Sequence, residues 1–148
     1  MSGRQHGFPC RRKLIKGITV RPLRPGDTGA VQAVFDRLGP CSRLFRFGGA
    51  KNVLFASDLE LLSRVDANHH VLVAYLEDQP VGIARLVRDG KVAEVAFAVV
   101  DELQCRGVGT VLVERLAADA RAAGIESFRA AISPSNSASL ALMRRLAA

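Results

Sequence analysis

The sequence predicts one mixed α/β domain in which helices flank a mostly antiparallel β-sheet. Three observations predict this class. Short apolar runs rich in valine and alanine stand beside amphipathic stretches, as strands and helices of one domain do. Two pairs of these runs are joined by short turns of the kind that connect antiparallel strands. A long helical stretch then separates two further runs, which is typical of a strand–helix–strand crossover.

The first part of the chain predicts one strand and two helices. Residues 18–23 (ITVRPL) form the strand, and a Pro-Gly turn ends it. Asp27 or Thr28 then caps a helix that runs to about residue 38. Its apolar stripe consists of Val31, Val34, Phe35 and Leu38. After an irregular connection, SDLELLSRV predicts a second helix with Ser57 as its cap and Glu60 in the capping-box position.

The middle of the chain predicts three antiparallel strands. HVLVAYL (70–76) and VGIARLV (81–87) are separated by the turn segment EDQP, and RDGK leads into the third strand at residue 92. The amphipathic helix that follows covers residues 107–124 and ends at a glycine. Its aligned apolar residues are Val108, Val111, Leu112 and Leu116. A strand (125–132) and a last helix that begins between Ser133 and Asn136 complete the domain.

Composition argues against membrane and nucleic-acid-binding proteins. No apolar run approaches the roughly 18 residues that a membrane span needs. The basic start of the chain is not followed by the apolar segment of a secretory signal, so we expect a cytoplasmic protein without membrane contact. Residues 1–17 supply five of the seven net positive charges, and we expect a disordered tail there. The folded domain, residues 18–148, carries only +2, which is no footprint for nucleic acid.

Cysteine and histidine positions predict no metal site and no disulfide. The three cysteines are odd in number and widely spaced, at positions 10, 41 and 105, so reduced thiols are expected. His69 and His70 are adjacent, and on a strand they point to opposite faces. They cannot jointly bind one metal ion.

A glycine loop stands where a predicted strand gives way to a helix. Gly107 and Gly109 flank Val108 there, and glycine can take a positive φ or let a ligand approach the backbone. Amide N–H groups at a helix N-terminus bind phosphate groups. The dinucleotide pattern GxGxxG fails at Leu112, and the lysine of an ATP-binding loop is absent nearby. The segment QCRGVG, beginning at Gln104, fits a third pattern, Q/R-x-x-G-x-G/A.

In this context the loop resembles the pyrophosphate-binding core of the GNAT superfamily of acyl-CoA N-acyltransferases. SRLFRFGGAK, AEVAFAVV and QCRGVGTVLVERLAADARAAGI together resemble the catalytic domain of bacterial Pat-type protein lysine acetyltransferases. The likeness covers about residues 18–148 and is most specific over residues 93–124. It implies the GNAT fold, with acetyl-CoA as the co-substrate.

The resemblance also implies which residues bind that co-substrate. Backbone groups of Phe97, Ala98 and Val99 would meet the pantetheine arm and the thioester. The loop that would hold the pyrophosphate consists of Gln104, Cys105, Arg106, Gly107, Val108, Gly109 and Thr110. Asn136 matches an asparagine that contacts pantetheine, and Arg145 could reach a CoA phosphate. The residues by themselves leave two alternatives open, a helix cap for Asn136 and a solvated face for Arg145.

Glu94 is the one charged residue in the apolar run from 92 to 100. Because a buried carboxylate is costly unless it is paired, we expect a partner. If the Asp-Gly pair forms the turn of the hairpin, Arg85 lies opposite Glu94, about 5 Å away between Cβ atoms. In the resembling family, a glutamate at this strand position is the general base that takes a proton from the amine. Both roles stay open, since one residue can fill both.

Two features depart from the family pattern. Many GNAT enzymes protonate the leaving thiolate with a tyrosine near the last helix, whereas the sole tyrosine here is Tyr75, on an earlier strand. A CoA thiolate is a good leaving group, so water can take that role. The family's C-terminal β-hairpin is also absent before the chain ends at Ala148. The strand around Phe128 would then keep an open edge. Two explanations stay open, a truncated chain and a homodimer that completes the sheet.

The acceptor is expected to be a protein lysine or a small amine. SRLFRFGG (42–49) interleaves two arginines with Phe45 and Phe47, either to grip a lysine stem beside the acceptor groove or to anchor a loop to the core. The expected reaction is acetyl transfer from acetyl-CoA to a primary amine, with Glu94 as the base. Two alternatives stay open, a CoA-binding regulatory or interaction module without turnover and a small-molecule amine N-acetyltransferase.

Overall fold

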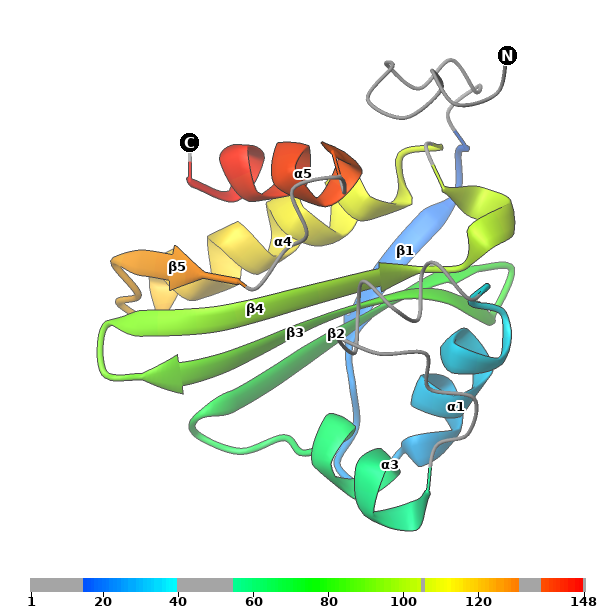
Figure 1. The fold of residues 1–148 in the computed structure, drawn as a ribbon, viewed down its shortest axis with the longest axis horizontal. Coiled ribbons are helices and arrows are strands. Elements are labelled where there is room, and N and C mark those ends of the chain that lie inside the picture. Colours follow the sequence, from blue (N-terminus) through cyan, green and yellow to red (C-terminus); the bar gives the residue numbers. More distant parts are fainter. Residues whose placement is uncertain (1–14, 40–54, 105, 131–136, 148) are drawn as a thin grey trace.

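The computed structural model describes residues 15–39, 55–104, 106–130 and 137–147. Within them the elements follow the predicted order of strand, two helices, three strands, helix, strand and helix. A 3-10 helix, η2 (Asp101–Leu103), adds one turn after the fourth strand. The predicted mixed α/β fold is confirmed (Figure 1).

The five described strands form one sheet in the order β1-β2-β3-β4-β5. They are β1 (Ile18–Pro22), β2 (His69–Leu76), β3 (Gln79–Asp89), β4 (Val92–Val99) and β5 (Ser127–Arg129). The first four strands pair antiparallel, and β5 pairs parallel with β4. The four α-helices of the described ranges are α1 (Thr28–Asp36), α3 (Ala56–Leu62), α4 (Val108–Ala122) and α5 (Ser137–Ala147).

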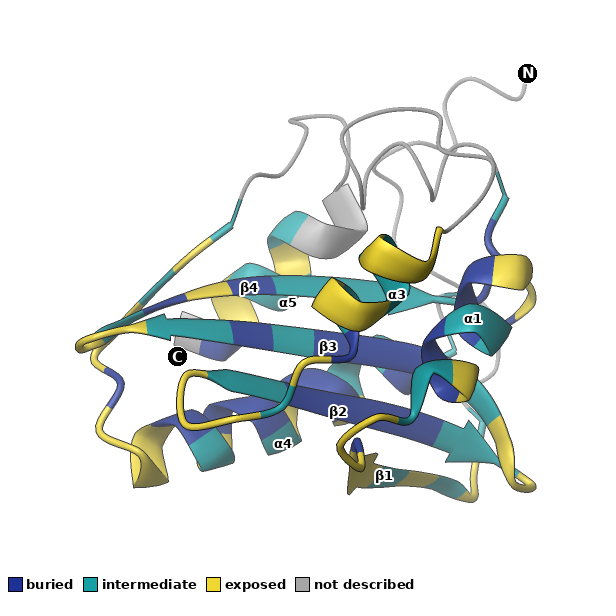
Figure 2. Ribbon diagram, turned by 90° about the horizontal axis from the view of Figure 1, so that it is seen from below, coloured by how far each residue is buried: buried dark blue, intermediate teal, exposed yellow. Residues whose placement is uncertain are grey.

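The helices cover the sheet in two layers, with α4 and α5 on one face and α1 and α3 on the other (Figure 1). The core is divided accordingly. The larger cluster lies mostly beneath α4 and includes the fully buried Leu72, Leu112 and Leu116. The smaller cluster lies beneath α1 and includes Val31, Phe35 and Val73. Figure 2 shows that α3 is largely exposed above this second face.

The helix ends match the sequence prediction only in part. Asp27 caps α1 as predicted, since its Oδ1 accepts a hydrogen bond from the Ala30 N–H at 3.4 Å. The predicted helix α3 is present, but its predicted capping residues were wrong. The helix begins one residue before Ser57, and the Asp58 carboxylate, not Glu60, accepts from the Phe55 N–H at 2.9 Å. An acid at the third helical position can bond back to the cap amide without a serine at the cap.

The predicted register of the β3–β4 hairpin was wrong by two residues. The turn is Gly90-Lys91, with φ +65° at the glycine, as in a type II′ turn that has glycine first. Arg85 therefore lies opposite Ala96, and Glu94 lies opposite Val87. A shift of two residues keeps every side chain on its predicted face. Arg85 and Glu94 thus still share a face, but they are diagonal neighbours and not a direct pair.

Candidate active site

The strands β4 and β5 separate after a short pairing. They are in register over only three residue pairs, the last of which joins Glu94 to Arg129 (Figure 1). Among the described strands, Val95–Val99 pairs with β3 alone, so its other edge presents backbone groups without a strand partner. The edge of a strand can bind an extended molecule that carries amide groups. The half-buried Phe97, Ala98 and Val99, predicted to meet pantetheine, lie on this segment.

The end of β4 is tied to the loop that follows it. The Gln104 side chain donates from Nε2 to the Val99 carbonyl at 3.1 Å, and the Val100 N–H donates to the Val81 carbonyl at 3.0 Å. Gln104 was predicted as part of the pyrophosphate loop. Its side chain joins that loop to the end of β4, so the loop and the strand edge are adjacent.

The loop ends at Gly107, which is the N-cap of α4 and has φ +95°. A non-glycine residue rarely takes this conformation, so glycine is required there. The first hydrogen bond of the helix runs from the Val111 N–H to the Gly107 carbonyl at 3.1 Å. The amides of Val108, Gly109 and Thr110 therefore have no acceptor inside the helix. With the positive end of the helix dipole, they suit a diphosphate.

The second glycine of the loop has a different function from the first. A Cβ on Gly109 would lie 3.0 Å from Leu142 Cδ1, so this glycine lets α5 pack closely on α4. The prediction that both glycines let a ligand approach the backbone stays a prediction, and Gly109 has this packing role in addition.

The remaining predicted co-substrate residues are placed only in part. Cys105 and Asn136 lie outside the described residues. The Arg106 carbonyl accepts a hydrogen bond from the Ile15 N–H at 2.9 Å, which brings the chain before β1 beside the loop. Arg145 forms an exposed ion pair with Glu114 at 3.2 Å, so it lies along α4. Its contact with a CoA phosphate stays a prediction.

Glu94 is exposed and not buried, because no described helix covers its end of the sheet. Its side chain is 63% exposed, and its Oε2 lies 3.9 Å from Nε of Arg129 on β5. The expected burial was wrong, since an apolar run on an open part of a sheet face does not bury its polar member. Tyr75, the sole tyrosine, packs under the Arg21 guanidinium, which lies 4.0 Å from the ring centre.

A small cavity opens between α1, α3, β3 and β4, on the face of the sheet that Glu94 shares. It holds about 20 Å³, which is room for a water molecule. Its lining residues are Val31, Val34, Phe35, Leu38, Leu62, Ile83, Arg85 and Ala98. Ala98 belongs to the free segment of β4, so the cavity adjoins the predicted thioester position. The segment 42–49, predicted to border the acceptor groove, lies outside the described residues.

Arg85 is the one charged residue among the described residues that line this cavity. Burial lowers the pKa of its guanidinium below the ordinary value; nearby Glu94 opposes that shift and Arg64 adds to it. The Arg85 Nη2 donates to the Leu61 carbonyl at a long 3.5 Å, and its buried Nε has no hydrogen-bond partner among the described residues. The sequence had predicted only Glu94 as a partner for this arginine.

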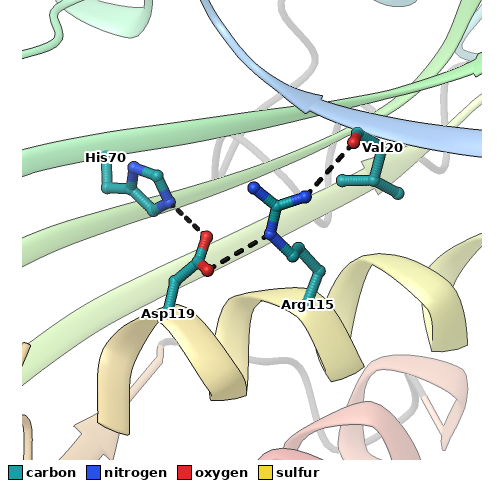
Figure 3. Close-up of polar contacts among 4 residues, drawn as sticks. All are labelled: Val20, His70, Arg115 and Asp119. Atoms are coloured by element: carbon teal, nitrogen blue, oxygen red, sulfur yellow. Dashed lines mark hydrogen bonds and ion pairs between the residues drawn. The ribbon is translucent and has the colours of Figure 1, made fainter. Parts of the chain in front are cut away.

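A polar cluster that the sequence did not reveal links the sheet to α4, on the face opposite the cavity (Figure 3). The Asp119 carboxylate on α4 contacts His70 Nε2 at 2.8 Å and accepts from Arg115 Nε at 3.2 Å. Arg115 also donates to the Val20 carbonyl at 3.3 Å. The cluster joins α4 to β1 and β2. Because His70 and Asp119 are 49 residues apart, no local pattern could indicate the contact.

The described ranges contain neither a cluster of metal ligands nor a membrane-spanning helix. No three histidine, cysteine, aspartate or glutamate side chains gather in those ranges as a metal site would require. None of the helices in those ranges combines the length and apolarity needed to cross a bilayer.

Comparison with known proteins gives a consistent result. The family model described as "Acetyltransferase (GNAT) family" matches residues 33–148. Acetyltransferase Pat of Mycolicibacterium smegmatis is 36% identical over an alignment of 140 residues. The alignment covers 87% of this chain and 40% of that protein. The chain thus spans well under half the length of this curated relative.

Two solved structures show how far the similarity extends in space. The GNAT domain of S. lividans Pat superposes with a TM-score of 0.79 and 28% identity, covering 86% of this chain and 78% of that one. A cAMP-binding acyltransferase from Mycobacterium smegmatis superposes with a TM-score of 0.60 and 30% identity, covering 87% of this chain and 39% of the other.

Proposed function

The chain belongs to the GNAT family of acetyltransferases, and on that premise we propose that it transfers an acetyl group from acetyl-CoA to the ε-amine of a protein lysine. The observation that carries the proposal is the hydrogen bond from Gln104 that joins the end of β4 to the loop before α4, beside a strand edge that no other described strand covers. A protein acceptor is what the resemblance to Pat-type protein lysine acetyltransferases implies, and a small amine is the alternative.

The co-substrate would lie along that surface. Its two phosphates would accept hydrogen bonds from the amides of Val108, Gly109 and Thr110, where Gly107 leaves the helix end open. Its pantetheine arm would add to the edge of β4 beside Phe97 and Ala98 as a strand adds to a sheet. A backbone N–H of that edge would then polarise the thioester carbonyl.

The acceptor must lose a proton before it attacks. A lysine ammonium has a pKa of about 10.4, so deprotonation at pH 7 costs about 4.6 kcal/mol. Glu94 stands four residues before Ala98, which is about 13 Å along an extended strand. The proton would therefore reach the carboxylate through water, and the exposure of Glu94 leaves room for it.

Bond making and breaking then follow without an enzyme-bound intermediate. The free amine attacks the carbonyl carbon, the N–C bond forms and the C–S bond breaks. The proton lost by the nitrogen passes through water to Glu94, and the departing thiolate takes a proton from solvent. Tyr75 has no part in this step, since its ring is packed beneath Arg21 on β1 and β2.

The test measures CoA thiol release with acetyl-CoA and a lysine peptide, alongside calorimetry of CoA binding. We expect Glu94→Gln to lower kcat/KM by about 10²- to 10⁴-fold and to leave CoA affinity unchanged. Glu126→Gln is the matched control, because Glu126 is equally exposed and pairs with Lys91 near the same strands. CoA binding without thiol release would favour a regulatory module, and absence of CoA binding would refute the proposal.

A further inference from the structure

Arg85 is half-buried, and its surroundings satisfy its guanidinium only in part. The guanidinium lines the cavity beside Ala98, and its only described hydrogen bond is the long one to the Leu61 carbonyl. The Nε is buried without a partner among the described residues. A buried N–H group without an acceptor is costly, and an anion bound to a partly desolvated guanidinium would supply that acceptor.

No aspartate or glutamate side chain supplies that anion. All 14 of these residues lie in the described ranges, and none of them forms an ion pair with Arg85. Glu94 acts on Arg85 only through space, and its one described ion pair is with Arg129. Arg85 is therefore available to a carboxylate from a bound molecule.

The charged side chains near the cavity favour an anionic ligand. Arg64 lies close enough to Arg85 to repel it, and Arg129 stands beside Glu94 on the edge of the same face. These described side chains comprise three arginines and one carboxylate. A bare lysine ammonium would be repelled by this set, whereas an amine that carries a carboxylate nearby would be attracted.

We propose that Arg85 binds a carboxylate of the acceptor, so that the protein acetylates amines with an acidic group close to the reacting nitrogen. The inference rests on the proposed function and names its substrate class. Arg85 and Glu94 flank Ala96 on one sheet face, at diagonal positions roughly 7–8 Å apart. One acceptor can therefore present its carboxylate to Arg85 and its amine to the water that leads to Glu94. The carboxylate belongs either to an acidic residue beside a lysine or to a free amino acid.

Two matched pairs of acceptors test the inference and distinguish these sources. The first pair is a lysine peptide with aspartate beside the lysine and the same peptide with asparagine there. The second is free lysine and lysine amide. We expect the wild type to prefer the acidic member of one pair by roughly ten- to a hundredfold in kcat/KM, mainly through KM. Arg85→Gln should abolish this preference, and Arg85→Lys should restore part of it.

Two controls separate substrate binding from folding. Arg21→Gln, on the same face but stacked on Tyr75, should leave the preference unchanged. Arg85→Gln should melt no lower than the wild type, because it removes an unpaired buried group. Equal rates for both members of both pairs, or a preference that survives Arg85→Gln, would overturn the inference.

Calorimetry with the acidic and neutral peptides, in the presence of CoA, provides a readout that does not depend on turnover. Tighter binding of the acidic peptide that is lost in Arg85→Gln would support the anion site even if no acetyl transfer occurred, in which case only the proposed function would fail. Equal binding of the two peptides would overturn the inference whether or not transfer occurred.

Discussion

The two faces of the sheet differ in how completely the helices bury them. On one face, α4 buries six residues, including Leu112 and Leu116, which have no exposed surface. On the other face, α3 buries none of its residues and leaves Phe55 and Leu61 exposed. Arg85, whose buried Nε has no partner among the described residues, lies on this second face. The difference predicts that α4 contributes more to the stability of the fold than α3 does.

The largest expected effect tests whether stability is concentrated beneath α4. Leu116→Ala should lower the free energy of unfolding by about 3 kcal/mol, because it leaves a cavity among fully buried neighbours. Leu62→Ala makes the same change on α3, where the side chain is only half-buried, and should cost less than half as much. Denaturant titration of both variants measures the two costs. An equal loss of unfolding free energy in the two variants would show that stability is not concentrated beneath α4.

The next effect tests the open end of α4. Gly107→Ala places a Cβ at φ +95° and should cost about 1–2 kcal/mol of stability. Gly26→Ala imposes a similar strain at φ +82°, where nothing lies within 4 Å of the new Cβ. Calorimetry with CoA should show weaker binding for Gly107→Ala alone. If Gly26→Ala weakened CoA binding equally, the loss would reflect strain and not the site.

A smaller effect tests the polar cluster beneath α4. Asp119→Ala should cost about 1 kcal/mol, since it leaves His70 and Arg115 without their shared acceptor (Figure 3). Glu114→Ala removes an exposed ion pair from the same helix and should cost less than about 0.5 kcal/mol. Thermal melting distinguishes the two variants. A cost for Asp119→Ala no larger than that of Glu114→Ala would show that the cluster does not brace the sheet.

The smallest expected effect on stability concerns the contact between Asp66 and His69, which lies outside both helix-covered faces. The hydrogen bond with His69 holds the pKa of the Asp66 carboxyl below its ordinary value of 3.8. A lowered pKa means that the contact stabilises the fold above about pH 3.8 and is lost as the pH falls further. The difference in Tm between wild type and Asp66→Asn should therefore shrink below that pH. A difference that stayed constant from pH 6 to pH 3 would contradict this assignment.

The sequence by itself determined the elements whose signals are local. The apolar stripe of α1, the glycine N-cap of α4 and the order of strands and helices follow from periodicity and turn chemistry. These features depend on residues a few positions apart. For that reason they could be read without knowing what packs against them.

Only the tertiary structure decided features that depend on distant parts of the chain. Three such features are the exposure of Glu94, the packing of Leu142 on Gly109 and the separation of β5 from β4. Each depends on how segments far apart in the sequence are arranged in space. The same holds for Arg85, whose burial depends on α1 and α3 together. Burial and charge compensation are sums over all neighbours in space, so the cost of an unpaired group becomes visible only when the chain is folded.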